Sequence, residues 1–332
     1  RYVLVRASQA IWIQNCSLVD ASNTTDAWWV GIRIEDGSTH NWFHHNLIGA
    51  VGYSTADDDI GGVFNIGNWQ DGTDGSHHNL IEDNTIFRGG HHVMEIASSF
   101  NIIRNNHFYN DNWMTCERTV TSGFCGNRLI GIYGPTANVL RNVIEGNHFS
   151  GTGLPADNET SAAISMRANH TIIRRNVFHH ADGPGIAAEA YETADMNPSH
   201  ARIYNNVFYR NGYNVTPDLA DWLGTGITIG NHSSSASVTD IAIRNNIFHE
   251  NRGGAVIFYS VDESTHLVSD NWEQMGDPGL IDLSGENDPT DPDIFDFHLD
   301  NDSPCVDAGG FLTSTIGGGE GTLITVADAA YF

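Results

Sequence analysis

Tyr133, Arg167 and Glu189 are side chains able to do acid–base chemistry, and each follows a short apolar stretch of similar pattern. The three stretches are residues 130–132, 164–166 and 186–188. If they stack, the three side chains are neighbours, and a guanidinium beside a phenol stabilises the phenolate. A phenolate can take the proton α to a uronate carboxylate, so the set is a candidate catalytic group for β-elimination. Arg167 and Glu189 also suit an ordinary cross-strand pair, and that interpretation stays open.

A second set, Arg33, Asn65 and Glu95, occupies the middle position of three comparable stretches further upstream. We predict that Arg33 and Asn65 bind substrate and that Glu95 is catalytic. Glu95 and Glu189 are three stretches apart, roughly 14 Å in a stack of strands. The two carboxylates of a glycosidase are roughly 5 to 9.5 Å apart, so these two cannot form such a pair. A partner for Glu95 would have to come from elsewhere.

Asp57, Asp58 and Asp59 form an acidic run that could supply this partner. Together with Glu95, the run could also hold Ca²⁺, which prefers carboxylate oxygens. Three consecutive aspartates equally suit a solvated turn, and that alternative stays open. The paired histidines of the chain, including those at 91 and 92 beside Glu95, are expected to be turn residues and not zinc ligands.

The elements that must position these side chains repeat along the sequence. Residues 101–109 read NIIRNNHFY, and similar segments recur around asparagines 15, 46, 84, 147, 176, 206 and 246. The shortest gap, from Asn84 to Asn106, is 22 residues. Each copy holds two short strands around an asparagine, and a third short strand precedes it. The repeat therefore predicts an all-β fold, a right-handed parallel β-helix (solenoid) of about eight to ten coils.

Asparagine suits the bend between the two strands of each copy. Its side chain tolerates left-handed backbone geometry and bonds to nearby main chain. Stacked at one corner of successive coils, these amides would bond to one another as a ladder. We therefore interpret the repeated asparagines as structural.

The pattern fades near residue 270, which divides the chain into two parts. Residues 1–270 are predicted to form the solenoid. Residues 271–332 are predicted to form a C-terminal cap packed on it, with an end strand at 322–332. Four insertions should project from one corner of the coils and wall a groove. They are residues 49–62, 110–128, 151–162 and 211–226.

The insertions carry rings and cations that suit a saccharide. Trp113, Tyr213 and Trp222 could stack on sugar rings, or could instead fold the loops onto the solenoid. Arg118 and Arg128 are the expected cations for a substrate carboxylate.

Composition limits the class of partner and the compartment. The chain has 41 acidic residues against 15 basic ones, all of them arginine, and a net charge of −26. Such a charge argues against nucleic acid or an anionic membrane as a partner, and the apolar runs are too short for membrane insertion. Cys116 and Cys125 lie close enough in one insertion to form a disulfide, which indicates an oxidising compartment. We expect a secreted or cell-surface extracellular protein.

The repeats resemble those of the pectate-lyase-like right-handed parallel β-helix superfamily. The ending, with DFHL at 296–299 and DAG at 307–309, is similar to the closing segment of many secreted bacterial β-helix proteins. The resemblance implies a polysaccharide bound along the outer face of the strand that precedes each motif. Some lyases of this fold use a lysine base, and this chain has no lysine.

The resemblance leaves two classes of function. The first is a secreted carbohydrate-active protein, a polysaccharide lyase or glycoside hydrolase acting on a glycan in the groove. The second is a non-catalytic structural protein such as an adhesin, a fibre subunit or a surface protein, in which copies of the chain would associate with one another.

Overall fold

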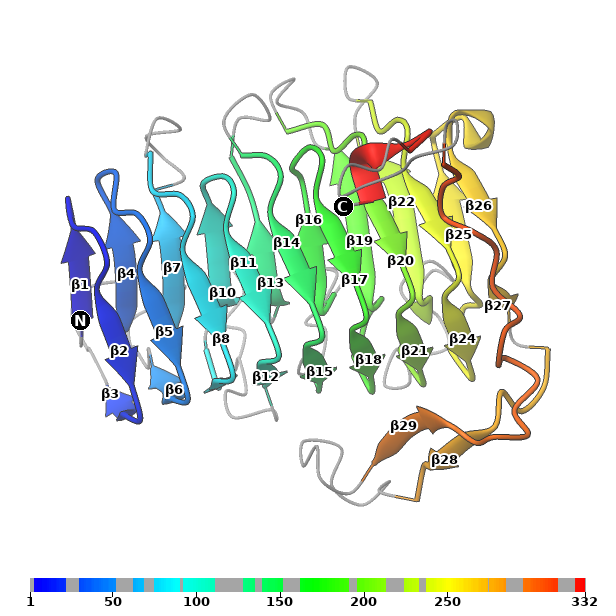
Figure 1. Cartoon of the computed structure of the whole chain (residues 1–332), viewed down its shortest axis with the longest axis horizontal. Helices are drawn as coiled ribbons and strands as arrows, with labels where there is room; N and C mark the ends of the chain where they lie inside the picture. Colours follow the sequence, from blue (N-terminus) through cyan, green and yellow to red (C-terminus); the bar gives the residue numbers. More distant parts are fainter. Residues whose placement is uncertain are drawn as a thin grey trace, which may run out of the picture.

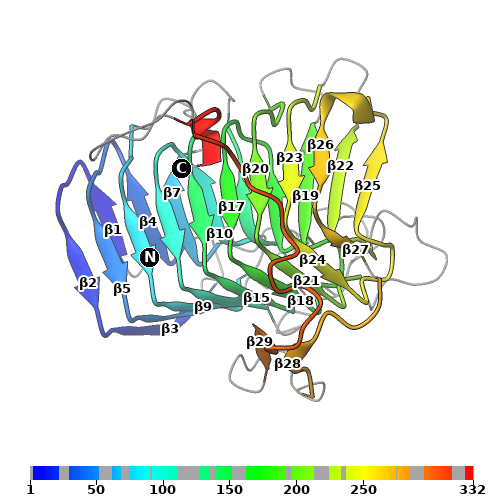
Figure 2. The ribbon, with the colours of Figure 1, turned by 45° about the vertical axis from the view of Figure 1, so that its right-hand side comes forward.

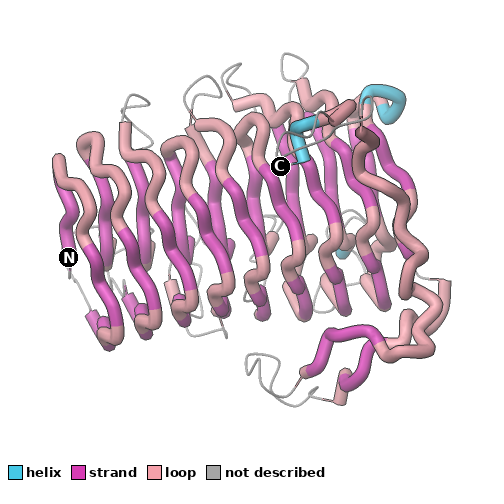
Figure 3. Tube along the Cα trace, viewed as in Figure 1, coloured by secondary structure: helices cyan, strands magenta, loops and turns pink. Residues whose placement is uncertain are grey.

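The chain winds into a tube of three parallel sheets, each crossed once per coil (Figure 1). This computed structural model describes residues 3–21, 30–51, 62–68, 75–89, 92–110, 128–134, 139–151, 162–190, 196–212, 224–232, 237–273, 275–284, 295–315 and 326–331. Each sheet has nine strands, which agrees with the predicted eight to ten coils of a right-handed parallel β-helix. Figure 3 shows that strands and their connecting loops make up nearly the whole trace.

In each coil, the strand of the first sheet precedes the asparagine-containing repeat in the sequence. Its strands are β1 (Val3–Arg6), β4 (Ile32–Glu35), β7 (Phe64–Gly67), β10 (His92–Ala97), β13 (Arg128–Ile132), β16 (Ile164–Met166), β19 (Ile186–Ala190), β22 (Ile227–Asn231) and β25 (Val256–Tyr259). The second sheet holds β2 (Trp12–Gln14), β5 (Trp42–His44), β8 (Leu80–Glu82), β11 (Ile102–Arg104), β14 (Val143–Glu145), β17 (Ile172–Arg174), β20 (Arg202–Tyr204), β23 (Ala242–Arg244) and β26 (Leu267–Ser269). The third sheet holds β3 (Ser17–Ala21), β6 (Leu47–Val51), β9 (Thr85–Phe87), β12 (His107–Tyr109), β15 (His148–Ser150), β18 (Val177–His179), β21 (Val207–Tyr209), β24 (Ile247–His249) and β27 (Trp272–Glu273).

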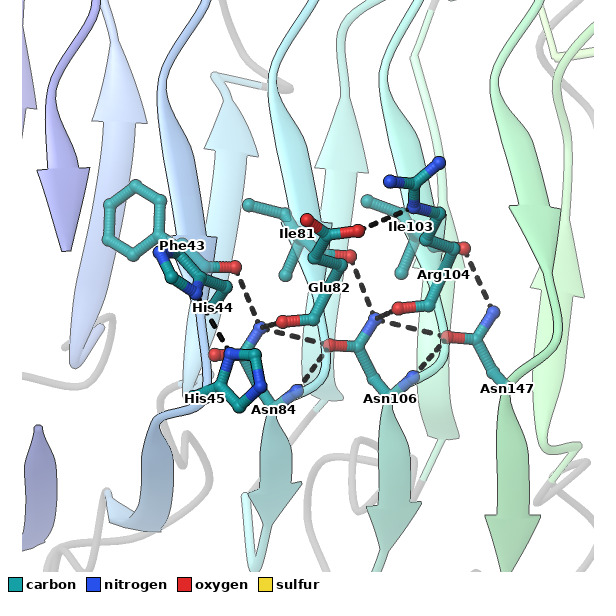
Figure 4. A network of polar contacts seen from close by, with 10 residues as sticks. All are labelled: Phe43, His44, His45, Ile81, Glu82, Asn84, Ile103, Arg104, Asn106 and Asn147. Atoms are coloured by element: carbon teal, nitrogen blue, oxygen red, sulfur yellow. Dashed lines mark hydrogen bonds and ion pairs between the residues drawn. The ribbon is translucent and has the colours of Figure 1, made fainter. Parts of the chain in front are cut away.

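An asparagine ladder runs along the corner between the second and third sheets (Figure 4). Asn106 Nδ2 donates to the carbonyls of Ile81 and Arg104, both at 2.9 Å, and to Asn147 Oδ1 at 3.0 Å. The same amide-to-amide bond links every neighbouring pair from Asn46 to Asn271. The predicted stacking of these corners is confirmed.

The position of the ladder differs from the prediction in the first coil. Cys16, and not Asn15, stands at the ladder position, because its backbone N–H donates to Asn46 Oδ1 at 3.0 Å. Asn15 has a φ of 54°, as does Asn105 just before the ladder residue Asn106. The left-handed backbone therefore belongs to the residue before each ladder asparagine, and the prediction that the ladder residue itself adopts it is wrong.

Stacked phenylalanines fill the side of the tube under the third sheet. Phe149, Phe178 and Phe208 are fully buried, with consecutive ring centroids 4.8 Å apart. That spacing equals the distance between adjacent strands, so the rings stack as a consequence of strand register. Each coil alone leaves its apolar face open, and stacking supplies the core.

The C-terminal segment runs back along the sides of the tube (Figure 2). Its hairpin, β28 (Leu280–Asp282) and β29 (Asp296–Leu299), brings Phe297 within 5.2 Å of His179 on the third sheet, measured between ring centroids. Further on, Tyr204 Oη donates to the carbonyl of Tyr331 at 2.5 Å on the second sheet. This segment therefore packs on the solenoid along its flanks.

The predicted end strand at 322–332 is wrong for its described part. Val326 makes one antiparallel bridge to Thr315, and Ala329–Tyr331 form a short 3₁₀ helix, η4. A second 3₁₀ helix, η2 (Glu263–Thr265), precedes β26. In the described ranges, no helix is both long and apolar enough to cross a membrane.

The four predicted insertions each connect a strand of the third sheet to the next strand of the first sheet. They therefore open from one corner. Most of their residues lie outside the described part of the chain. The sequence predictions that fall there are Asp57, Asp58, Asp59, Trp113, Cys116, Arg118, Cys125, Tyr213 and Trp222.

Candidate functional site

The outward columns predicted from strand alternation are present on the first sheet. Asn65 pairs with Arg33 on one side and Glu95 on the other, and the column continues through Gly131 to Ser165. In parallel sheets, paired residues lie about 4.8 Å apart, so these side chains are in reach of one another.

The second column has the same register. Ile132 pairs with Met166, and the next residues along the two strands are Tyr133 and Arg167. On the following strand, Glu189 pairs with Gly230 of β22. The two predicted sets therefore share one face, and they meet at β10 and β13.

His92 joins the two sets. Its Nε2 is 2.9 Å from Tyr133 Oη, and its Nδ1 is 4.0 Å from Glu95 Oε2. Both rings lie over Gly131, where a Cβ atom would overlap them. His92 is 2% exposed and Tyr133 is 8% exposed, so their hydrogen bond is held away from bulk water. The pair can share and transfer one proton.

Two guanidiniums lie close to the Tyr133 ring. The Cζ atom of Arg167 is 4.8 Å from the ring centroid, and that of Arg128 is 5.9 Å away. Arg128 was predicted in an insertion, but it is the first residue of β13, buried and paired with His92. The two positive charges can attract a substrate carboxylate.

Glu95 is a buried carboxyl group whose pKa is raised to about 7. Burial is the main cause, because it disfavours the charged form, and the positive charge of Arg33 opposes it in part. Arg33 also contacts Glu35, with Nη1 3.5 Å from Oε2. Near neutral pH, Glu95 can therefore act as a hydrogen-bond donor as well as an acceptor.

Polar atoms along this column are buried without a hydrogen-bond partner in the part of the chain that the structure describes. They are Arg33 Nε, Asn65 Oδ1, Glu95 Oε1 and Ser165 Oγ. Native proteins leave few such atoms, so four in one column indicate a place for a polar ligand.

Calcium fits this column only in part. Asn65 Oδ1 and Glu95 Oε1 could supply two oxygen ligands, whereas Ca²⁺ takes six to eight. The guanidinium of Arg33 beside them repels a dication. Within the described ranges, no group of three His, Cys, Asp or Glu side chains is placed to hold a metal ion.

Glu189 belongs to a separate cluster at the far end of the same face. Tyr259 Oη donates to Glu189 Oε1 at 2.9 Å, and His232 Nε2 lies 3.5 Å from that oxygen. Burial raises the pKa of Glu189, but hydrogen bonds from His232 and Tyr259 and the charge of Arg167 lower it below its usual value. Glu189 is therefore an anion at neutral pH.

From the sequence, His92 was expected beside Glu95 as a turn residue, whereas in the structure it is the first residue of β10. Its position at the start of β10, on the strand next to β13, which leads to Tyr133, could have indicated that the two side chains lie close together. Tyr259 and His232 were missed entirely, because the alignment of strands ended at β22.

Comparisons with known proteins agree with this architecture. A family model described as the right-handed beta helix region matches residues 110–272. Among solved structures, alginate lyase from Paenibacillus sp. str. FPU-7 is similar, with 15% identity over 79% of this chain and 83% of that chain and a TM-score of 0.50. The chain therefore shares the right-handed parallel β-helix fold with these proteins.

Another similar structure is DFA-IIIase from Arthrobacter chlorophenolicus A6 in complex with GF2. It is 13% identical over 83% of this chain, with a TM-score of 0.42, and this chain spans 56% of its length. No curated protein sequence gives a significant match.

Proposed function

We propose that this chain is a polysaccharide lyase that cleaves an acidic, uronate-containing glycan lying along the outer face of the first sheet. The observation that carries the proposal is the buried hydrogen bond between His92 and Tyr133, with the guanidiniums of Arg128 and Arg167 within 6 Å of the centre of the phenol ring.

Elimination needs the substrate carboxylate to be neutralised, so that the neighbouring carbon becomes acidic. Arg33 supplies a positive charge and Glu95 a carboxyl group that is half protonated near pH 7. The buried, unpartnered oxygens of Asn65 and Glu95 lie beside it and would bond to the sugar. Half-buried Arg33 and Arg167 are the parts of the site that reach the surface.

The reaction itself uses the His92–Tyr133 pair. Tyr133 Oη passes its proton to His92 Nε2, 2.9 Å away, and takes the proton from the carbon α to the carboxylate. The electron pair forms a carbon–carbon double bond, and the bond to the glycosidic oxygen breaks. That oxygen then receives a proton from the pair, which restores the starting state of the site.

Elimination is favoured over hydrolysis by the arrangement of the carboxylates. Glu95 and Glu189 are three strands apart, roughly 14 Å, beyond the reach of a glycosidase pair. Glu189 is fully buried and, unlike Glu95 Oε1, its Oε1 already accepts a hydrogen bond from Tyr259, so it is not available to a sugar.

The fold shared with an alginate lyase supports a polyuronate as the substrate class. As part of the proposal, the protein works outside the cell, where such polymers occur. Calcium is the alternative means of neutralising the carboxylate, with Asn65 and Glu95 among its ligands.

The test is an assay of wild-type protein on uronate-containing and neutral polysaccharides, following unsaturated ends by ultraviolet absorbance and reducing ends by a colour reaction. We expect unsaturated ends from a polyuronate. Tyr133→Phe and His92→Gln should each lower kcat by about 100-fold or more, the usual size of an acid–base contribution. Tyr209→Phe, a buried tyrosine on the third sheet, is the matched control and should retain activity.

Adding a chelator to the assay distinguishes neutralisation of the substrate carboxylate by Arg33 and Glu95 from neutralisation by Ca²⁺. Loss of activity on chelation would assign that role to Ca²⁺. Reducing ends without unsaturated ends would replace the lyase by a hydrolase. A wild-type protein that is inert on every glycan would favour the non-catalytic structural alternative.

A further inference from the structure

A carboxylate next to the proposed active site is out of reach of any substrate. Glu189 is completely buried, although it lies on the face where the glycan would bind. Tyr259 and His232 enclose it from the C-terminal side. Tyr259 can lie there because its ring covers Gly230, where a Cβ atom would overlap it.

The hydrogen bonds of this cluster have a definite direction. An ionised carboxylate only accepts, so Tyr259 Oη donates its proton to Glu189 Oε1. Tyr259 Oη also bonds to His232 Nε2, and it must therefore accept from that nitrogen. Histidine, tyrosine and glutamate thus form a chain of donors that ends on a fixed negative charge.

Arg167 lies between this charge and the Tyr133 ring. Met166 pairs with Ala188, so the next residues, Arg167 and Glu189, are neighbours across adjacent strands. On its other side, the guanidinium of Arg167 lies 4.8 Å from the Tyr133 ring centroid. A fixed anion beside an arginine side chain reduces the number of conformations that its guanidinium can adopt.

We propose that Glu189 is a positioning residue, held by Tyr259 and His232, that fixes the guanidinium of Arg167 over the ring of Tyr133. Glu189 acts through Arg167 and does not touch the glycan. The inference rests on the proposed lyase function, and it replaces the catalytic role expected for Glu189 from the sequence. It also extends the functional unit from β10 to β25.

The kinetic test compares Glu189→Gln, Tyr259→Phe and Glu189→Asp with wild type on the polyuronate. Glu189→Gln should lower kcat about tenfold or more and leave KM within about twofold, because an interaction needed for the chemical step is lost while binding groups remain. Tyr259→Phe should give a smaller loss, and Glu189→Asp should recover part of kcat. Glu82→Gln is the matched control, since Glu82 is a buried carboxylate paired with Arg104 on the second sheet.

A measurement without substrate separates this inference from the proposed function. The guanidinium nitrogens of Arg167 are followed by ¹⁵N NMR and assigned with Arg167→Lys. Wild type should show restricted rotation of the guanidinium, which Glu189→Gln should release and Glu82→Gln should not. Unchanged Arg167 signals, or a KM that rises as much as kcat falls, would overturn the positioning role. Released Arg167 signals in a protein without lyase activity would sink the proposed function and leave the positioning role in place.

Discussion

Acid should weaken the packing between the C-terminal segment and the third sheet. Three histidines, His107, His148 and His179, lie on neighbouring strands of this sheet, and Phe297 packs on the last two. His148 Nε2 and His179 Nε2 are 2.5 Å apart. At that distance one nitrogen donates and the other accepts, so the two histidines cannot both be protonated.

The magnitude follows from the shifted pKa values. Burial, with a smaller effect of His148, lowers the pKa of His107 to about 3, and burial lowers that of His148 to about 4. Burial and the neighbouring histidines hold the pKa of His179 well below 6.5. As pH falls below about 6.5, the unfolded chain takes up protons that the folded chain refuses, so each histidine removes about 1.4 kcal/mol of stability per pH unit. Between pH 6.5 and 5, His107 and His148 together remove about 4 kcal/mol, and His179 adds to this loss.

Urea unfolding at pH 7.5 and pH 5 measures this loss. In the double variant His148→Gln and His179→Gln, only His107 of this group still titrates, so the acid-induced loss should shrink by at least about 2 kcal/mol, the part due to His148. His298→Gln is the control, because His298 is an exposed residue of β29 and its removal should leave the loss unchanged. An equal loss in wild type and the double variant would refute the reasoning.

Two further predictions concern the ladder and the site. Asn106→Ala should lower the free energy of unfolding by about 3 kcal/mol or more, because it leaves buried amide and carbonyl partners unsatisfied. Asn105→Ala, at the exposed position with left-handed backbone, should lower it by about 1 kcal/mol. Urea unfolding measures both losses, and equal losses would count against the ladder. Glu95 has a pKa raised from 4.5 to about 7, so the stability it provides is present below pH 4.5 and is lost as pH rises to about 7. As pH rises from 4.5 to 8, the free energy of unfolding of Glu95→Gln should therefore rise by about 3 kcal/mol relative to that of wild type. The same unfolding assay measures this difference, and its absence would contradict a buried, uncharged Glu95.

The sequence was sufficient for the register of the first sheet. Strand side chains alternate and each coil adds one strand, so aligning the repeats placed Arg33, Asn65 and Glu95 in one column, as the structure has them. The alignment of Tyr133 with Arg167 followed from the same rule. These predictions needed only local pattern and a constant repeat.

The remaining features depend on contacts between distant residues. His92 reaches Tyr133 because Gly131 leaves space above β13, which strand alternation alone does not reveal. The path of the C-terminal segment depends on contacts such as that between Tyr204 and Tyr331, 127 residues apart. Such contacts follow no repeat, so the sequence pattern predicted a cap but not its course.

The mass of the glycan products tests the central claim most directly. Elimination at the His92–Tyr133 pair cleaves the chain without adding water, so wild-type protein should convert a polyuronate into oligosaccharides that each carry one unsaturated end, and Tyr133→Phe should not. Products that have gained water at each cleavage, or equal product formation by wild type and Tyr133→Phe, would contradict the account.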